Sequence, residues 1–326
     1  MECSPIDQRV SPALVVGGTI AVLALITVHL QVTAVGMPFV ETQQVRRHFA
    51  VLNGTAPSPW QYRVLSEYLI EALAFVPRRL GVPDALVLTF IGVRVVQNAA
   101  VLLAAYAYYR RLSVPPATAV IGLNLLALAM LQANLESDLS FNTYFDVLFY
   151  LVAALAVLSR SWWAIVAIAA AAALNRETSG LIPLMPLAAL MSAPDRTRVL
   201  RAVALASFGY AAVFLSLRYW YGPRPLMPGW GRAPGVSLFL FNLRRYSWVR
   251  MCATFGALPL LAATGYRRWP AELKAFCWLI VPVWLAVHAV AGVLTETRLL
   301  LVPLFLVVLP GCLLIDARRG DARVSA

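Results

Sequence analysis

Glu41 follows the first long apolar run of the chain by six or seven residues, in the segment PFVETQQVRRHF, with two arginines and a histidine close behind it. A carboxylate at the mouth of a membrane, partly removed from water and near positive charge, has the features of a general base. The other interpretation is an ordinary solvated loop residue, because a single glutamate is weak evidence. Glu41 is our candidate catalytic residue.

Arg94 lies inside an apolar run that begins near Asp84. Ten residues of helix span about 15 Å, which brings Arg94 near the centre of a bilayer. A charge at that depth costs at least ~2.5–3.5 kcal/mol. Gln97 and Asn98 follow at i+3 and i+4 and therefore share its helix face. We expect this face to line a polar cavity that accepts an anionic group; the alternative is a buried arginine paired with an acid for packing.

The segment 161–192 consists of two apolar stretches of 14 residues, separated by the sequence NRET that contains Arg176 and Glu177. Fourteen helical residues reach only about 21 Å, whereas the hydrocarbon core of a bilayer is about 30 Å thick. The turn must then lie below the membrane surface, where protein or water has to surround its charges. The pattern predicts a sunken, outward-open polar cavity, and the alternative is an exposed hairpin with a local ion pair.

Asp138, Asn142 and Asp146 follow one another at i, i+4 and i+8, and Glu136 precedes them. Two carboxylates and an amide offer hard oxygen ligands, so this stripe suits a divalent cation or sugar hydroxyls. Three groups on one helix face rarely complete a metal shell, and we favour helix capping and solvation for Asp138 and Asn142. Asp146 lies deeper and stays a candidate. The metal and cofactor requirement is left open.

Two further groups of charge complete the set. Glu296 and Arg298, in VLTETRLLLVPL, are expected to point toward the same face as NRET. The five arginines of the loop 218–246 suit phosphate groups or lipid headgroups. The four cysteines show no metal-ligand or redox spacing.

The amino-acid composition indicates the class of protein that carries these residues. The chain has 326 residues, of which 61% are hydrophobic and only 13% charged, against about 45–50% and about 25% in soluble domains. A soluble enzyme, a disordered chain and a fibrous protein are therefore excluded. The net charge of +12 comes from scattered arginines, a pattern that favours membrane anchoring and anionic lipids over nucleic acid. We expect an all-α polytopic membrane protein with a single membrane domain, 1–326.

At about 20 residues per span, we predict ten spans, near residues 12–34, 84–109, 114–133, 141–159, 161–174, 179–192, 199–217, 247–265, 273–294 and 299–315. An even number places both termini on one side of the membrane. Each side carries 13 basic residues, but the short basic connections 110–113, 193–198 and 266–272 share one side. The positive-inside rule is read on such loops, so we predict cytoplasmic termini.

The two long loops, 35–83 and 218–246, then face outward. Within the first, residues 60–76 (WQYRVLSEYLIEALAFV) combine an apolar stripe with the charged row Arg63, Glu67 and Glu71 at i, i+4 and i+8. This period predicts an amphipathic helix in the interface plane. The alternative is a helix that packs on the other spans.

An acidic residue soon after the first span, a long outer loop with an amphipathic helix and short spans around an outer cavity resemble the GT-C glycosyltransferase superfamily. The segments PWQYRVLSEYL, NRETSGLIPL and ETRLLLVPLF resemble bacterial membrane proteins of that group. The resemblance implies transfer of a sugar from a polyprenyl-phosphate donor to a glycan, lipid or protein acceptor, on the outer face of the bacterial cytoplasmic membrane.

The resemblance also implies roles for individual residues. A first-loop Asp or Glu is the catalytic base in that family, and here the role would fall on Glu41. The candidate substrate-binding residues are Tyr62, Arg63, Arg94, Asn98, Asp146, Arg176, Glu177, Glu296 and Arg298. Two other classes stay open. A secondary transporter would use Arg94 and broken spans, and a non-catalytic membrane subunit would tolerate replacement of Glu41.

Overall fold

The computed structural model describes residues 11–133, 138–190, 192–227 and 231–315. Every regular element within these ranges is helical, and the one β-type contact there is an isolated bridge between Ser58 and Leu226. The expected all-α class is therefore confirmed. Glu136 and the residues beyond 315 lie outside the described residues, so the predicted role of Glu136 and the C-terminal position are not addressed.

Six helices are long and apolar enough to cross a membrane, and they indicate a membrane protein. These are α1 (Pro12–Val35), α5 (Ala85–Arg111), α6 (Pro116–Ala133), α7 (Phe141–Leu158), α9 (Arg196–Tyr221) and α13 (Ala271–Ala291). Each coincides with one of the ten predicted spans.

The other four predicted spans are short or broken elements. They are α8 (Trp162–Ala173), η3 (Glu177–Ala189), the pair α11 (Arg245–Phe255) and α12 (Leu258–Gly265), and the series η5 (Thr297–Leu300), α14 (Leu301–Pro303), η6 (Leu304–Val308) and α15 (Leu309–Leu313). Proline explains part of this, because it removes a backbone donor and clashes with the preceding turn. Pro183 and Pro186 stand three residues apart in the 3₁₀ helix η3. The number of spans remains a prediction.

The first long loop is folded into short helices. Gly36 ends α1 with φ +87°, a conformation that suits glycine, and the chain turns into α2 (Met37–Phe39), η1 (Val40–Gln44) and α3 (Val45–Leu52). After η2 (Trp60–Tyr62) comes α4 (Val64–Arg79). The remaining elements are α10 (Val236–Asn242) and η4 (Tyr266–Arg268).

The amphipathic helix is present as α4, but its charged row does not face water. Glu67 is buried and Arg63 half-buried against the protein, whereas Tyr68, Leu69 and Leu73 of the apolar stripe are exposed. An outward apolar face is what a helix needs in order to contact lipid.

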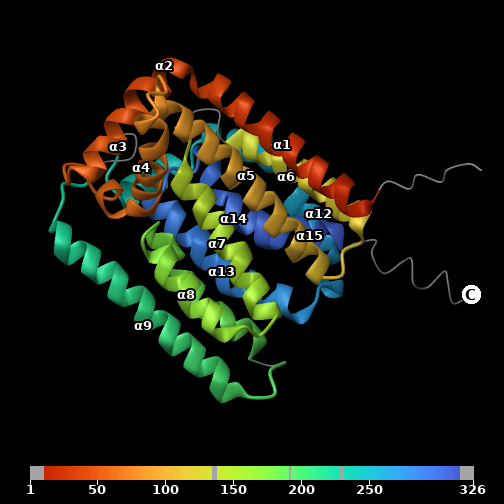
Figure 1. Cartoon of the computed structure of the whole chain (residues 1–326). Coiled ribbons are helices and arrows are strands. Elements are labelled where there is room, and N and C mark those ends of the chain that lie inside the picture. The colour runs from red at the N-terminus through yellow and green to blue at the C-terminus, as the bar shows by residue number, and fades with distance from the viewer. Residues whose placement is uncertain (1–10, 134–137, 191, 228–230, 316–326) are drawn as a thin grey trace, which may run out of the picture.

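The helices assemble around α7, the most buried of the long helices. Figure 1 shows α7 near the centre, α9 along one side and α1 across another. The long helices α1 and α9 end, and α5 and α7 begin, at the end of the molecule that carries α2, α3 and α4. The start of α1 lies near α12 and α15 at the opposite end (Figure 1). The segments predicted to be external therefore gather at one end.

Candidate functional site

A cavity of about 400 Å³ opens at the end of the molecule where α2 to α4 lie. Its walls come from segments far apart in sequence: α3, η2, α4, the start of α7, the NRET turn, the loop before α10 and the end of α13. Among the described residues its charged lining consists of four arginines and four carboxylates, namely Arg47, Arg63, Arg176, Arg298, Glu67, Asp138, Glu177 and Glu296. We call this the arginine cavity.

One wall is held by Glu177, which two arginines contact. Arg63 donates to Oε2 of Glu177 from Nη2 at 2.9 Å and from Nε at 3.3 Å, and Arg218 donates to Oε1 at 3.4 Å. The Trp60 ring lies 4.2 Å from the Arg47 guanidinium and 5.3 Å from that of Arg63. The first loop, the NRET turn and α9 are thereby joined.

The opposite wall is built on Asp138. Its carboxylate accepts from the backbone N–H of Ser140 at 2.9 Å and thereby shapes the turn that begins α7. Arg298 donates to Asp138 at 3.0 Å and to Glu296 at 2.7 Å, and Arg47 forms a further ion pair with Asp138. Burial, followed by the nearby Arg298, lowers the pKa of Arg47 to about 10, so this side chain is still charged at neutral pH.

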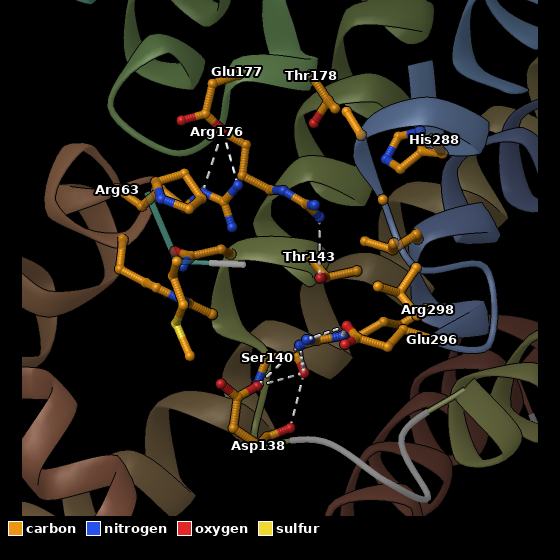
Figure 2. A pocket seen from close by; sticks show the side chains of 18 of the residues that line it. Arg63, Asp138, Ser140, Thr143, Arg176, Glu177, Thr178, His288, Glu296 and Arg298 are labelled. Atoms are coloured by element: carbon orange, nitrogen blue, oxygen red, sulfur yellow. Dashed lines mark hydrogen bonds and ion pairs between the residues drawn. The ribbon is translucent and has the colours of Figure 1, made fainter. Parts of the chain in front are cut away.

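Among the four arginines that line the cavity, Arg176 has the fewest protein partners. Its side chain is 7% exposed, and Nη1 donates to Oγ1 of Thr143 at 3.2 Å. Among the described residues its Nε has no hydrogen-bond partner and no carboxylate forms an ion pair with it. Figure 2 shows Arg176 reaching toward Thr143, with Arg63 on one side and Arg298 on the other. Arg176 therefore places a buried positive charge at the cavity and makes few hydrogen bonds to the protein.

Behind the cavity, His48 joins two carboxylates of α4. Nδ1 lies 2.7 Å from Glu67 and Nε2 lies 3.0 Å from Glu71, which also pairs with Arg78. Burial lowers the pKa of His48, but the hydrogen bonds to Glu67 and Glu71 outweigh it and raise the pKa above its ordinary value. An imidazolium donates from both nitrogens, so this geometry suits the charged form of His48.

The remaining wall is apolar. It is lined by side chains of the loop before α10, of α10 itself and of the end of α13, including Leu226, Met227, Pro234, Leu238 and Val287. Asn242 holds α10 against α13, because its Nδ2 donates to the carbonyls of Ala289 at 2.9 Å and Gly292 at 2.8 Å. The arginine cavity thus has one polar wall and one apolar wall.

Five predicted site residues line the arginine cavity: Arg63, Arg176, Glu177, Glu296 and Arg298. The candidate substrate-binding residues Arg94, Asn98 and Asp146 do not line this cavity. Arg94 is fully buried, and it donates to Gln31 at 3.1 Å and to Gln97 at 2.7 Å beneath the Tyr144 ring.

Asn98 is sealed in as well, because its Nδ2 donates to Thr27 at 2.9 Å. Within the described residues no carboxylate pairs with Arg94, so the predicted acid partner is not what holds it. Amide oxygens accept from Nε and Nη1 and the Tyr144 ring lies against the guanidinium, whereas Nη2 has no hydrogen-bond partner among the described residues. The sequence predicted correctly that polar groups surround Arg94. These groups are Gln31 on α1, Gln97 on α5 and the Tyr144 ring on α7, and they enclose the guanidinium away from the arginine cavity.

Asp146 supports the cavity from below. It accepts from the hydroxyls of Thr178 at 2.7 Å and Ser179 at 2.5 Å, and it is fully buried. Asn175 donates to the carbonyl of Asn142 at 2.8 Å. These bonds fasten the NRET turn to α7 and so set the position of Arg176.

Glu41 and Tyr62 lie apart from the lining. Glu41 is exposed on η1 and does not line the arginine cavity. Tyr62 is buried and donates its hydroxyl to the carbonyl of Gly222 at 2.8 Å, with Arg218 over its ring. Tyr62 therefore fixes the first loop to the end of α9.

Three charged lining residues escaped the set of candidates: Arg47, Glu67 and Asp138. A signal existed for Glu67, since it stands four residues after Arg63 in the charged row of α4. The favoured roles of helix capping and solvation do not fit Asp138: it is buried against two arginines from distant segments, and the N-cap of α7 is Ser140 with no side-chain cap. As for a cation, no three His, Cys, Asp or Glu side chains of the described chain cluster at metal-binding distance.

Comparisons with known proteins do not extend this description. No protein-family model matches the chain, and neither a curated protein nor a solved structure matches it.

Proposed function

We propose that the protein is a membrane glycosyltransferase of the GT-C type, which moves a sugar from a polyprenyl-phosphate donor to an acceptor hydroxyl. The observation that carries the proposal is Arg176, a buried guanidinium that lines the arginine cavity and forms no direct ion pair with a carboxylate of the described residues. A phosphate oxygen is the acceptor that such a group prefers, because guanidinium and phosphate match in charge and geometry.

The neighbouring charges favour one phosphate position. Arg63 is held by Glu177 and Arg298 by Asp138 and Glu296, so their charge is largely balanced within the protein. Arg176 lies between them, and no carboxylate of the described residues forms a direct ion pair with it, although the charges of Asp146 and Glu177 act on it at longer range. A phosphate at Arg176 would be stabilised by it directly and by the two flanking arginines at longer range.

The two-sided character of the arginine cavity supports an amphiphilic donor. The polar wall suits phosphate and sugar hydroxyls, whereas Leu226, Met227 and Leu238 offer apolar surface to the first prenyl units. The exposed apolar stripe of α4 supports a position of this helix in the membrane interface. A lipid-borne substrate would then enter from the bilayer at the level of the cavity.

Glu67 is the first-loop carboxylate that lines the arginine cavity, so we assign the role of general base to Glu67 rather than to Glu41. Glu67 takes the proton of the acceptor hydroxyl, and the oxygen of that hydroxyl attacks the anomeric carbon of the donor sugar. The bond between that carbon and the phosphate oxygen breaks, and its electron pair leaves with the polyprenyl phosphate. The developing charge on the phosphate is stabilised at Arg176.

The finer topology belongs to the same proposal. The arginine cavity would face the outside of the bacterial cytoplasmic membrane, with ten membrane-inserted segments and both termini cytoplasmic. The clustering of 35–83, 175–178 and 218–246 at one end supports this arrangement, because the alternation of the predicted spans puts these segments on one side.

The test uses purified protein in nanodiscs, polyprenyl phosphate as the binding probe, and a panel of polyprenyl-phosphate hexoses and pentoses as donors. Arg176→Gln should weaken binding by about 10- to 100-fold, since a hydrogen bond to a charged group contributes about 1.5–3 kcal/mol. Arg79→Gln is the matched control, because Arg79 is exposed on α4 outside the cavity. Equal binding by both variants would place the phosphate elsewhere.

Catalysis is read as release of polyprenyl phosphate with a membrane extract as acceptor source. Glu67→Gln should lower the rate by about 10²–10⁴-fold with binding unchanged, because glutamine still accepts a hydrogen bond from His48. Glu41→Gln should retain the wild-type rate. The reverse result, with Glu41→Gln inactive and Glu67→Gln active, would make Glu41 the base.

A further inference from the structure

A second pocket lies between the first turns of α8 and α9, away from the arginine cavity, which lies at the other ends of these two helices. It has a volume of about 470 Å³, and three arginines and two tryptophans line it: Arg160, Arg198, Arg201, Trp162 and Trp163. Nothing in the proposed transferase reaction uses these residues.

The pocket is graded from charge to hydrocarbon along the helix axis. Arg198, Arg201, Ala202 and Leu205 stand at i, i+3, i+4 and i+7 of α9 and therefore share one helix face. The guanidiniums come first along the helix, and the apolar side chains follow one to two turns deeper. Val166 of α8 continues the apolar part.

The arginines here have donors to offer. Arg201 is exposed, and no ion pair of the described residues involves it. Arg198 pairs with Asp195 at 3.0 Å, but both side chains are largely exposed, and such surface pairs contribute little. Arg160 donates to the carbonyl of Ser192 at 2.8 Å through one nitrogen, Nη2.

Local charge favours an anion. Arg160, Arg198 and Arg201 line the pocket, the nearby Asp195 is paired with Arg198, and Glu272 approaches only through Ser192, at 3.4 Å. The Trp163 ring is 76% exposed beside the guanidiniums. Tryptophan is enriched where hydrocarbon meets the headgroups of a bilayer, which places the arginines at phosphate level.

We propose that this second pocket binds an anionic phospholipid, with the lipid phosphate between Arg198 and Arg201 and one acyl chain along Val166 and Leu205. A free phosphate would use the arginines but leave the apolar half of the pocket empty. A zwitterionic lipid would fill the apolar half, but its cationic choline group would meet further positive charge. The combined surface therefore selects an anionic lipid.

The test measures lipid binding to detergent-purified protein by native mass spectrometry with phosphatidylglycerol, phosphatidylcholine or inorganic phosphate as probe. Arg201→Gln should weaken phosphatidylglycerol binding about fivefold, the effect of one surface arginine. Arg196→Gln removes the same charge from the same helix outside the pocket and should leave binding unchanged. The double variant Arg198→Gln/Arg201→Gln should lose about 25-fold.

Three results would overturn the proposal. Equal weakening by Arg196→Gln and Arg201→Gln would indicate diffuse surface charge rather than a pocket. Equal binding of phosphatidylglycerol and phosphatidylcholine would remove the anionic selectivity. Displacement of bound phosphatidylglycerol by millimolar inorganic phosphate would identify a free-phosphate site.

Discussion

At the scale of single residues, His48 connects the loop helix α3 to α4 through charge. Both of its ring nitrogens face carboxylates, Glu67 at 2.7 Å and Glu71 at 3.0 Å, and the side chain is fully buried. A neutral imidazole can donate from only one nitrogen, so loss of the proton would turn one of these contacts into a repulsion between lone pairs. The attachment of α3 to α4 therefore depends on the protonation of His48.

This contact predicts a pH dependence of stability. The pKa of His48 is raised in the folded protein, so its contribution is fully present below the ordinary pKa and is lost as pH rises through the folded value. We expect the unfolding temperature in detergent to fall across that rise in the wild type. His48→Asn should be less stable at pH 6 and should lack the decline.

His29→Asn is the control, because His29 is exposed on α1. It should retain the wild-type decline. A decline of equal size in His48→Asn would show that another group titrates in this range.

Residue-level inference from sequence worked where the chain is apolar enough that each charge demands an explanation. That reasoning found Arg63, Arg176 and Arg298, which line the arginine cavity. It failed for Arg94, because besides Gln97 on the same helix its partners are Gln31 on α1 and the Tyr144 ring on α7. The pairing of helices that brings such neutral partners together is not encoded in local spacing.

At the scale of elements, the six long spans followed from hydropathy, whereas the broken segments did not. A stretch of apolar residues looks alike whether it forms one helix or several short ones. Pro303 and Pro310 subdivide the last stretch, and Gly256, with φ +52°, separates α11 from α12. Prolines are visible in the sequence, but neighbouring helices decide whether each one kinks or ends an apolar helix.

Close packing of the last short helix makes one glycine indispensable. A Cβ on Gly311 of α15 would overlap the ring of Trp269, which is buried and packs on Tyr266 with ring centroids 5.2 Å apart. We expect Gly311→Ala to lower the free energy of unfolding by about 1–3 kcal/mol, the usual cost of overpacking.

Gly17→Ala is the matched control, because no atom lies within 4 Å of the added Cβ and Gly17 is inside α1. Alanine should stabilise a helix interior by up to about 1 kcal/mol. Denaturant unfolding in detergent measures both variants. A neutral Gly311→Ala would mean that α15 can shift away from Trp269.

At the scale of the whole molecule, the arginine cavity depends on the alternation of the spans. Its residues come from the first loop, the start of α7, the turn after α8, the loop after α9 and the segment after α13. In the predicted arrangement of ten spans, each of these segments is separated from the next by two crossings, which would bring all of them to one end. One crossing more or fewer between two of these segments would put them at opposite ends of the molecule. Their convergence at one end therefore supports the predicted order of crossings, but it does not show which end faces the outside of the membrane.

Cysteine labelling tests both the order and the orientation. In a cysteine-free background, Thr55→Cys and Arg232→Cys mark the cavity end, and Ser159→Cys and Arg267→Cys mark the opposite end; all four positions are exposed. A membrane-impermeant maleimide should label the first pair in intact bacterial cells and the second pair only after permeabilisation. Labelling of Ser159→Cys and Arg267→Cys alone would reverse the orientation and place the arginine cavity in the cytoplasm, where a phosphate-bearing nucleotide donor could reach it. If the two members of a pair were labelled from different sides of the membrane, the predicted order of crossings would be wrong. Two positions lie on the same side only if the segments between them cross the membrane an even number of times.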